Sequence, residues 1–238
     1  MMYYYQGQYR ESETMHKRAL AGYEKTLGPD HPETLGVVQN LGVLYQGHGK
    51  VDGAEKMWKR ALEGYEKVLA PDHPDTLIVI QNLGILYQGR GQVDEAEQML
   101  KRALEGYEKV LEPDHPRTLM VVQNLGMLYQ GRGKVDEAEK MLKHALAGYE
   151  KALESDHPDT LMVVQNLGVL YYGRGQVDEA EQMWKRALAG YEKVLEPDHP
   201  DVLRVAQNLG ILYQGRSKVD EAERMFERLE KALEPDLQ

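Results

Sequence analysis

A His-Pro pair recurs in this chain at a fixed interval of 42 residues. Each pair is followed by the same two landmarks, a Gln-Asn-Leu-Gly segment and then a tyrosine with a glycine two residues later. Self-similarity at a period of about 20–50 residues is typical of solenoids, in which supersecondary units stack on their neighbours. We therefore predict an elongated repeat array instead of one or two globular domains. The repeated histidines are His31, His73, His115, His157 and His199.

The first half of each repeat predicts a helix, as residues 71–112 illustrate. Pro74 suits the first turn of a helix, where its missing N–H is not needed, and either Asp72 or His73 would cap that turn. Apolar residues then recur at a spacing of about 3.6 residues until Gln88. Two glycines with one residue between them follow, and we expect them to end the helix.

The second half of the repeat predicts an amphipathic helix that begins in the acidic segment 94–97 and runs to about Leu111. Glu97 and Lys101 lie four residues apart on its polar side, a pairing worth about 0.2–0.5 kcal/mol that indicates a solvated face. A glycine recurs at the position of Gly106 in other copies. Within a helix, glycine is less favourable than alanine by roughly 1 kcal/mol. We therefore expect close helix approach there, with a tyrosine of a neighbouring repeat as one candidate for the covering side chain. Tyr107 lies on the apolar stripe and is expected in the core.

The plan extends over the whole chain, and we predict a single solenoid over residues 1–238. Residues 1–28 form a partial repeat, with a stub of a first helix and a second helix from about Tyr9 to Leu27. The last copy is degenerate, since Leu229 and Glu230 replace an alanine and a leucine, which suits a terminus that no longer stacks. The start is expected to be cut mid-repeat, as in a part of a larger protein. The full repeats are 29–70, 71–112, 113–154, 155–196 and 197–238.

The composition of the chain excludes several classes of function. The chain is 42% hydrophobic, which is enough for a continuous core, and it has no cysteine for disulfides or thiolate chemistry. A formal net charge of −10 argues against nucleic acid and anionic membranes as partners, because both need clustered Lys and Arg. No apolar run reaches the roughly 18 residues of a membrane span, and the N-terminus does not resemble a signal peptide. We expect a cytoplasmic protein.

Neither a metal centre nor an active site is predicted. A zinc site needs three or four converging ligands, which one histidine per repeat cannot supply. The five histidines are therefore interpreted as turn residues bonded to the adjacent loop. The serines occur singly, and neither a Ser–His–acid arrangement nor a phosphate loop is found. We expect no cofactor and no enzymatic activity.

Small residues at Gly84, Ala96 and Ala103, with large ones at Tyr87 and Leu100 between them, follow a known order. This pattern resembles the tetratricopeptide repeat, in which small residues mark helix contacts. The chain departs from that motif at Glu108, where proline is usual, so the second helix can run on and the repeat is longer. With its Asp-His-Pro turn, the repeat is similar to the kinesin-light-chain type of tetratricopeptide repeat. The resemblance implies an all-α, right-handed superhelical solenoid of antiparallel helix pairs. Related arrays also form sensor arms of larger proteins.

The resemblance implies that the first helices line a concave groove. Their outward side is apolar at its centre and edged by amides, and exposed apolar strips usually mark partner sites. An asparagine amide can bond both polar groups of one peptide unit, and repeats roughly 10 Å apart match about three residues of extended peptide. The predicted groove residues are Asn40, Asn82, Asn124, Asn166, Asn208, Gln81, Gln123, Gln165, Ile85, Met127, Val169, Tyr172 and Arg204. We expect specificity to come from the apolar positions, from Arg204 and Tyr172, and from the turn arginines Arg90, Arg132, Arg174 and Arg216.

Three alternatives stay open at this point. Asn and Gln can instead bond neighbouring repeats and only hold the stack. The ends of the array can stack between chains and give dimers or filaments, because an unpaired terminal repeat leaves a stacking surface. A recently duplicated or consensus-designed array would have no dedicated ligand. The leading prediction is a scaffold for a protein or peptide segment, with end-to-end self-association as its rival.

Overall fold

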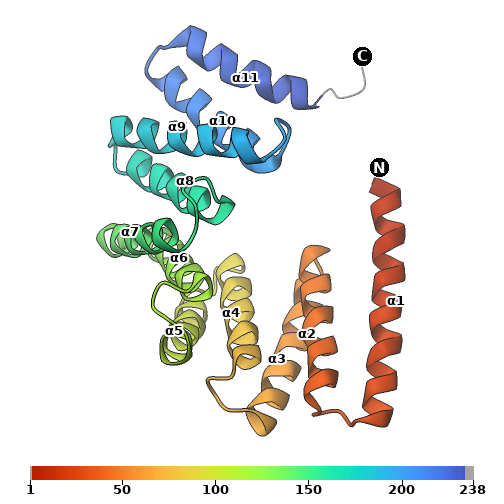
Figure 1. The fold of residues 1–238 in the computed structure, drawn as a ribbon. Coiled ribbons are helices and arrows are strands. Elements are labelled where there is room, and N and C mark those ends of the chain that lie inside the picture. The colour runs from red at the N-terminus through yellow and green to blue at the C-terminus, as the bar shows by residue number, and fades with distance from the viewer. Residues whose placement is uncertain (1, 234–238) are drawn as a thin grey trace. The chain divides into compact units, whose positions relative to one another are not determined.

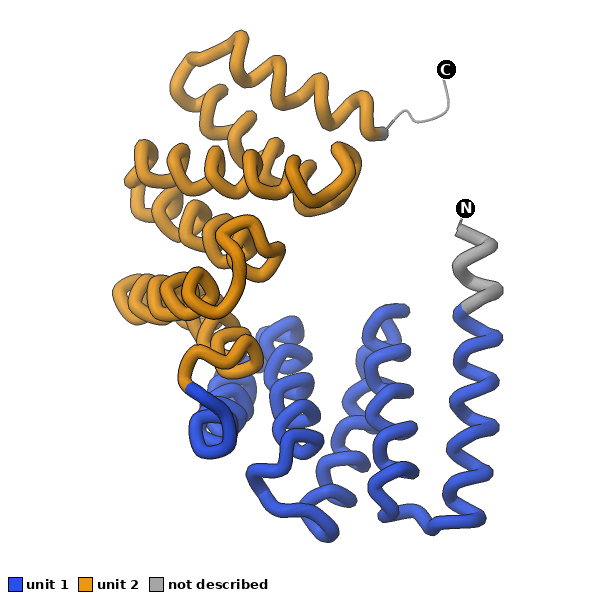
Figure 2. Tube along the Cα trace, in the orientation of Figure 1, with its two compact units in different colours: residues 1–112 blue, residues 113–238 orange. Residues whose placement is uncertain are grey.

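The computed structural model describes the backbone of residues 2–233 and the side chains of residues 9–232. Over that range it contains eleven α-helices and no β-strand (Figure 1). The predicted all-α class is therefore confirmed. Figure 2 shows two compact units, Met1–Glu112 and Pro113–Gln238, whose boundary falls between two predicted repeats. The single solenoid over residues 1–238 stays a prediction.

Unit 1 consists of one long helix followed by two helix pairs. Its helices are α1 (Met2–Thr26), α2 (Pro32–Gly47), α3 (Val51–Val68), α4 (Pro74–Gly89) and α5 (Val93–Val110). Each helix packs on the next one along the chain. Each of the pairs α2–α3 and α4–α5 corresponds to one repeat, and its two helices are the predicted first and second halves of that repeat.

Unit 2 consists of three helix pairs of the same kind. They are α6 (Pro116–Gly131) with α7 (Val135–Ala152), α8 (Pro158–Gly173) with α9 (Val177–Val194), and α10 (Pro200–Gly215) with α11 (Val219–Leu233). Each second helix also packs on the first helix of the following pair. The degenerate sequence of the last copy therefore still forms a helix pair over the described residues.

A histidine starts each first helix. Nδ1 of His73 accepts a hydrogen bond from the backbone N–H of Asp75 at 3.2 Å, and Pro74 follows as the first helical residue. This decides between Asp72 and His73 as the cap. It also corrects the predicted bond to the adjacent loop, because the histidine bonds to the helix that it starts. The same bond is made by His31, His115, His157 and His199.

Helix α1 differs from its prediction. It is continuous from Met2 to Thr26, where the sequence predicts a stub and a separate helix from about Tyr9. In the four copies from α2 to α8 two glycines end the first helix, and the second of them, such as Gly91, has a positive φ of 72°. In the last copy Ser217 takes the place of the second glycine, also with a positive φ. Tyr5 stands at the position of the first glycine, so the stop signal is incomplete and the helix continues.

The mid-helix glycines bring the two helices of a pair close together. A Cβ on Gly64 would lie 2.8 Å from Cδ1 of Leu35, so only a glycine leaves room for that leucine. The close approach is as predicted, but the covering side chain is a leucine of the same repeat and not a tyrosine of a neighbour. The same leucine–glycine pairs are Leu77 with Gly106, Leu119 with Gly148 and Leu161 with Gly190.

Large side chains from the second helices fill the core. Tyr65, Tyr107, Tyr149 and Tyr191 expose at most 2% of their surface, which confirms their predicted core position. Trp58 is fully buried. Such burial keeps each first helix in one place and thereby sets the direction in which its outward side chains point.

Candidate binding surface

Each first helix of unit 2 exposes at least one large apolar side chain. Met127, Val169 and Ile211 occupy the same repeat position on α6, α8 and α10 and expose 38%, 39% and 44% of their surface. Seven residues earlier, Met120 and Met162 are exposed to a similar degree. We call these five residues the apolar row. The structure thus leaves uncovered the side chains that the sequence places on the outward side.

Unit 1 continues this pattern less strongly. Val43 on α2 is half exposed, whereas Ile85 on α4 is only partly accessible. The outward side of α4 is therefore less open than that of α8, although their sequences are nearly the same.

The asparagines of the predicted ladder are only partly accessible. Asn40 is exposed, and Asn82, Asn124, Asn166 and Asn208 are half-buried. The side-chain nitrogens of Asn124 and Asn166 are buried and have no hydrogen-bond partner among the described residues. The role of these amides in holding a peptide stays a prediction.

The glutamines are more deeply placed. Gln81, Gln123 and Gln165 expose 7%, 3% and 3% of their surface. Side chains so buried offer little to an extended ligand. They fit the alternative in which glutamine connects helices, and the Oε1 atom of Gln165 accepts a hydrogen bond from Arg204 of the next repeat at 3.3 Å.

Arg204 and Tyr172 add chemistry that other copies lack. Arg204 also donates to Asp201 at 2.5 Å, and half of its side chain is exposed. Tyr172 is exposed, and its ring centroid lies 5.5 Å from that of Trp184. Both side chains are accessible in unit 2, where the apolar row is also found.

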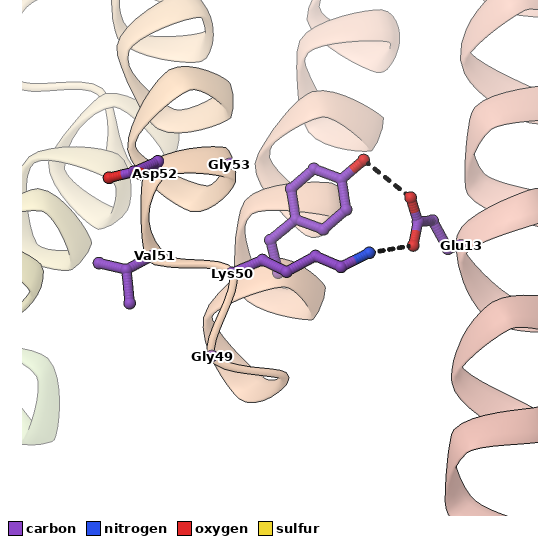
Figure 3. Close-up of a pocket in the computed structure, with 7 residues that line it drawn as sticks. Glu13, Gly49, Lys50, Val51, Asp52 and Gly53 are labelled. Atoms are coloured by element: carbon purple, nitrogen blue, oxygen red, sulfur yellow. Dashed lines mark hydrogen bonds and ion pairs between the residues drawn. The ribbon is translucent and has the colours of Figure 1, made fainter.

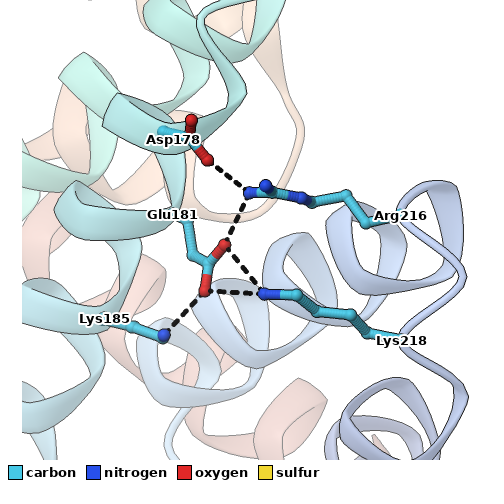
Figure 4. Close-up of polar contacts among 5 residues, drawn as sticks. All are labelled: Asp178, Glu181, Lys185, Arg216 and Lys218. Carbon is cyan, nitrogen blue, oxygen red and sulfur yellow. Dashed lines mark hydrogen bonds and ion pairs between the residues drawn. The ribbon is translucent and has the colours of Figure 1, made fainter.

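The turn arginines are engaged in links between repeats. Arg216 donates to Asp178 at 2.6 Å and to Glu181 at 2.9 Å (Figure 4). Lys218 and Lys185 also bond to Glu181, at 3.3 and 2.6 Å. Burial raises the pKa of Glu181, but the two lysines outweigh that effect and the pKa ends below its usual range. The predicted contribution of these arginines to specificity therefore competes with a structural role.

The same link recurs in other repeats. Arg90 pairs with Asp52 and Glu55, and Arg174 pairs with Asp136 and Glu139. A tyrosine joins each cluster, since the Tyr171 hydroxyl donates to Glu139 at 3.3 Å and the Tyr87 hydroxyl donates to Glu55 at 3.4 Å.

A shallow surface hollow beside α1 has a variant of this link. Figure 3 shows the Lys50 side chain reaching the Glu13 carboxylate, to which its ammonium group donates at 2.8 Å. The Tyr45 hydroxyl donates to the same carboxylate at 3.2 Å. Hydrogen bonds from Lys17 and Lys50 lower the pKa of Glu13 to about 2. Its carboxylate is therefore charged, and its bonds to Tyr45 and Lys50 connect α1 to the following helix pair.

The role of these glutamates was missed in the sequence. The Glu97 position fits one half of an i,i+4 pair on a solvated face, and the pair with Lys101 does form at 2.7 Å. At the equivalent Glu55, however, only 17% of the side chain is exposed, because the following repeat covers it. The available signal was the recurrence of an arginine about 35 residues downstream of each such glutamate.

The described residues contain neither a membrane span nor a metal-binding cluster. Over residues 2–233, no helix has the length and apolar character needed to cross a membrane. Within the same range, no three His, Asp or Glu side chains come together in a way that could hold a metal ion.

Comparison with protein families assigns the fold. The sequence profile of the tetratricopeptide repeat matches residues 1–66, 35–109, 80–151, 117–183 and 160–234, which together span nearly the whole chain. The chain belongs to the tetratricopeptide repeat family. No curated protein matches this tetratricopeptide array over its sequence.

Solved structures similar to this tetratricopeptide array include kinesin-light-chain-like proteins. A putative kinesin light chain from Podosopora anserina with nearly identical TPR-like repeats is 30% identical, over 87% of this chain and 99% of that chain, with a TM-score of 0.69. BtubC (BKLC) from P. vanneervenii is 24% identical, over 94% and 90% of the two chains, with a TM-score of 0.77. The predicted kinesin-light-chain-like type of tetratricopeptide repeat is therefore confirmed.

A more distant structure shares the tetratricopeptide fold alone. The Rap protein complexed with Competence and Sporulation Factor is 18% identical, over 94% of this chain and 62% of that chain, with a TM-score of 0.74. Tetratricopeptide arrays are typically scaffolds for protein interaction, and the fold is generally not enzymatic.

Proposed function

We propose that this protein is an interaction scaffold that holds an extended peptide, or a segment of a partner protein, along the outward side of its first helices. The observation that carries the proposal is the apolar row on α6, α8 and α10. A soluble protein rarely exposes a row of Met, Val and Ile at matching positions without a partner, since such a surface favours association.

The spacing of the repeats and the chemistry of the exposed side chains support a peptide as the ligand class. Repeats stacked roughly 10 Å apart present one apolar side chain per about three residues of an extended chain. The half-buried asparagines lie in the same helices and would bond the peptide backbone after the side chains of Asn124 and Asn166, whose nitrogens are buried, rotate outward. The apolar row would select the side chains of the peptide. Arg204 and Tyr172 would favour an acidic or aromatic residue at one end of that segment.

A protein of related fold, the Rap protein, has been solved in complex with Competence and Sporulation Factor. That precedent supports ligand binding by such arrays, and it assigns no ligand to this chain. The proposal therefore rests on the exposed side chains of this protein.

A display selection with random unstructured peptides tests the proposal. Peptides selected on the intact protein should share apolar residues at a regular spacing, and they should lose binding when Asn124, Asn166 and Asn208, which all lie in unit 2, are replaced by alanine. Circular dichroism must show unchanged helicity in that variant. Selected peptides that bind the triple variant with undiminished affinity would refute the asparagine ladder.

Self-assembly through the ends of the array is the alternative function. Light scattering over a hundredfold range of concentration separates the two. A binding scaffold keeps the mass of one chain, whereas an assembling array grows in mass with concentration.

A further inference from the structure

Three of the five side chains in the apolar row contain sulfur. Met120 and Met127 on α6 and Met162 on α8 expose 39%, 38% and 36% of their surface. We call these three residues the row methionines. The chain has no cysteine, so thioethers are its only sulfur groups, and thioethers react with peroxides. The apolar row is therefore a chemically reactive surface as well as a candidate binding surface.

The methionines of the second helices are less accessible than the row methionines. Met141 shows why, because a Cβ built on Gly126 of α6 would lie 3.3 Å from the Cβ atom of Met141. The second helix thus holds this methionine against the backbone of its paired first helix. The half-buried methionines of this kind are Met57, Met99, Met141, Met183 and Met225. An oxidant in solution should therefore reach the row methionines first.

One exposed methionine lies outside the row. Met15 on α1 exposes 56% of its surface and belongs to unit 1. It should react with a peroxide as readily as Met127 does. Because Met15 is not part of the apolar row, it provides an internal control for every effect of oxidation on that row.

The same repeat positions in unit 1 contain no sulfur. Val43 and Ile85 stand where α6 has Met127, and Ile78 stands where α6 has Met120. Aliphatic side chains without a thioether have no place on the oxidation ladder of sulfur. A peroxide would therefore alter the outward sides of α6 and α8 and leave those of α2 and α4 unchanged.

The reaction is a two-electron transfer of oxygen. The thioether sulfur attacks one oxygen of the peroxide, an S–O bond forms while the O–O bond breaks, and the second oxygen leaves as water once it has taken up the proton. Sulfur is oxidised and one peroxide is reduced for each sulfoxide. A sulfoxide reductase reverses the step, since two thiols become a disulfide and the oxygen leaves as water.

The core of unit 2 is protected from this chemistry. Leu119, Tyr149, Leu161 and Trp184 expose at most 3% of their surface, and none of them contains a thioether. They keep α6 and α8 in place whether or not the row is oxidised. A sulfoxide in the row therefore replaces an apolar contact surface by a polar one without unfolding the helix pairs.

We propose that the row methionines form an oxidative modification site, at which a peroxide makes the apolar row polar and releases the bound segment. The inference rests on the scaffold function proposed above, because it describes the regulation of that same surface. Methionine adapts its flexible side chain to apolar ligands, and methionine-rich interfaces are disrupted when the thioether becomes a polar sulfoxide. The reduced chain thus binds its segment, and the oxidised chain does not.

Mass spectrometry after graded treatment of the full chain with hydrogen peroxide tests the order of reaction. Met127 and Met162 should become sulfoxides as fast as Met15 and faster than Met141. A peptide selected on the reduced chain should slow the reaction at Met127 and Met162 and leave Met15 unaffected. Equal rates at Met127 and Met141 would overturn the inference, because the row would then have no greater reactivity than a half-buried methionine.

The affinity of the selected peptide tests the consequence of oxidation. Fluorescence anisotropy should show binding at least about tenfold weaker after the peroxide treatment, and a methionine sulfoxide reductase should restore it. Unchanged affinity after full conversion of the row methionines would overturn the inference. So would a loss of helicity, measured by circular dichroism, that parallels the loss of affinity, because oxidation would then act by unfolding.

Matched variants assign the effect to the row. The sulfur-free row variant combines Met120→Leu, Met127→Leu and Met162→Leu, which keep the side chains apolar and close to their original volume. Whatever its affinity before treatment, that affinity should be the same after the peroxide. Met15→Leu is the control and should stay as sensitive to the peroxide as the unaltered chain. Equal sensitivity of the sulfur-free row variant would overturn the inference.

An apolar fluorescent dye separates this inference from the scaffold function. A selection that yields no peptide would refute the scaffold function and with it the release of a segment, whereas the dye tests the modification site by itself. Dye fluorescence on the unaltered chain should fall after the peroxide treatment and should stay constant on the sulfur-free row variant. An equal fall on both chains, or a fall on neither, would overturn the modification site.

Discussion

Leu77 lies directly against Gly106 in the helix pair of unit 1. A Cβ on that glycine would come within 3.0 Å of Cδ1 of Leu77 and nearer still to Cδ2. Leu77 exposes 1% of its surface, so it has little room to move aside. The glycine is thus a packing residue, despite its unfavourable helix propensity.

Replacing Gly106 with alanine should destabilise the protein. Alanine adds up to about 1 kcal/mol of helix propensity, but overpacking a core costs about 1–3 kcal/mol, so a net loss of about 1 kcal/mol is expected. The matched change is Gly22→Ala, where nothing opposes the propensity gain and stability should rise. Urea unfolding measures both, and a Gly106→Ala variant more stable than the unaltered chain contradicts the packing role.

Arg216→Ala should destabilise unit 2, because it removes hydrogen bonds to two carboxylates. Glu181 keeps its two lysines, so the loss stays moderate. Arg224→Ala is the control, since Arg224 is exposed and makes no ion pair among the described residues. Thermal unfolding of the two variants should therefore differ, and equal midpoints would show that the link adds nothing.

Glu13 should make stability depend on pH in the acid range. Its pKa of about 2 in the folded protein lies below the ordinary value of about 4.3. Its contribution is therefore complete above about pH 4.5 and is lost as the pH falls towards 2. Glu13→Gln should be less stable than the unaltered chain at pH 7, and the gap should close by pH 2. Glu11→Gln, at an exposed position, should show no such gap.

His73 should be replaceable by asparagine but not by alanine. Its Nδ1 atom accepts the backbone N–H of Asp75, a role that an asparagine side-chain oxygen can take over. The loss of a cap costs about 1 kcal/mol, so His73→Ala should unfold at lower urea than His73→Asn. Equal midpoints would mean that this bond does not stabilise α4.

The helix pairs could be predicted because their signals are local. Proline after a histidine starts each first helix, and a glycine followed two residues later by a second glycine, or by Ser217 in the last copy, ends it. Those signals lie within one repeat and need no knowledge of neighbours. Where one is incomplete, at Tyr5, the prediction of a helix break was wrong and α1 continues.

The surface could be predicted only in part, because accessibility depends on the next repeat. The helical period places Met127 and Gln123 on adjacent outward positions, yet Met127 is exposed and Gln123 is buried. Likewise the sequence around Glu55 indicates a solvated position. In the structure, however, Arg90, which is 35 residues further along, bonds to Glu55 and covers it. A single helical wheel contains no information about such long-range contacts.

The affinity of a selected peptide for a variant of the apolar row tests the central proposal most directly. Met127→Glu with Val169→Glu places two charges on the row, whereas Val110→Glu with Val194→Glu does so at exposed valines of second helices. The proposal predicts that the first variant binds at least about tenfold more weakly and that the second binds normally. Equal affinity of both variants would contradict it.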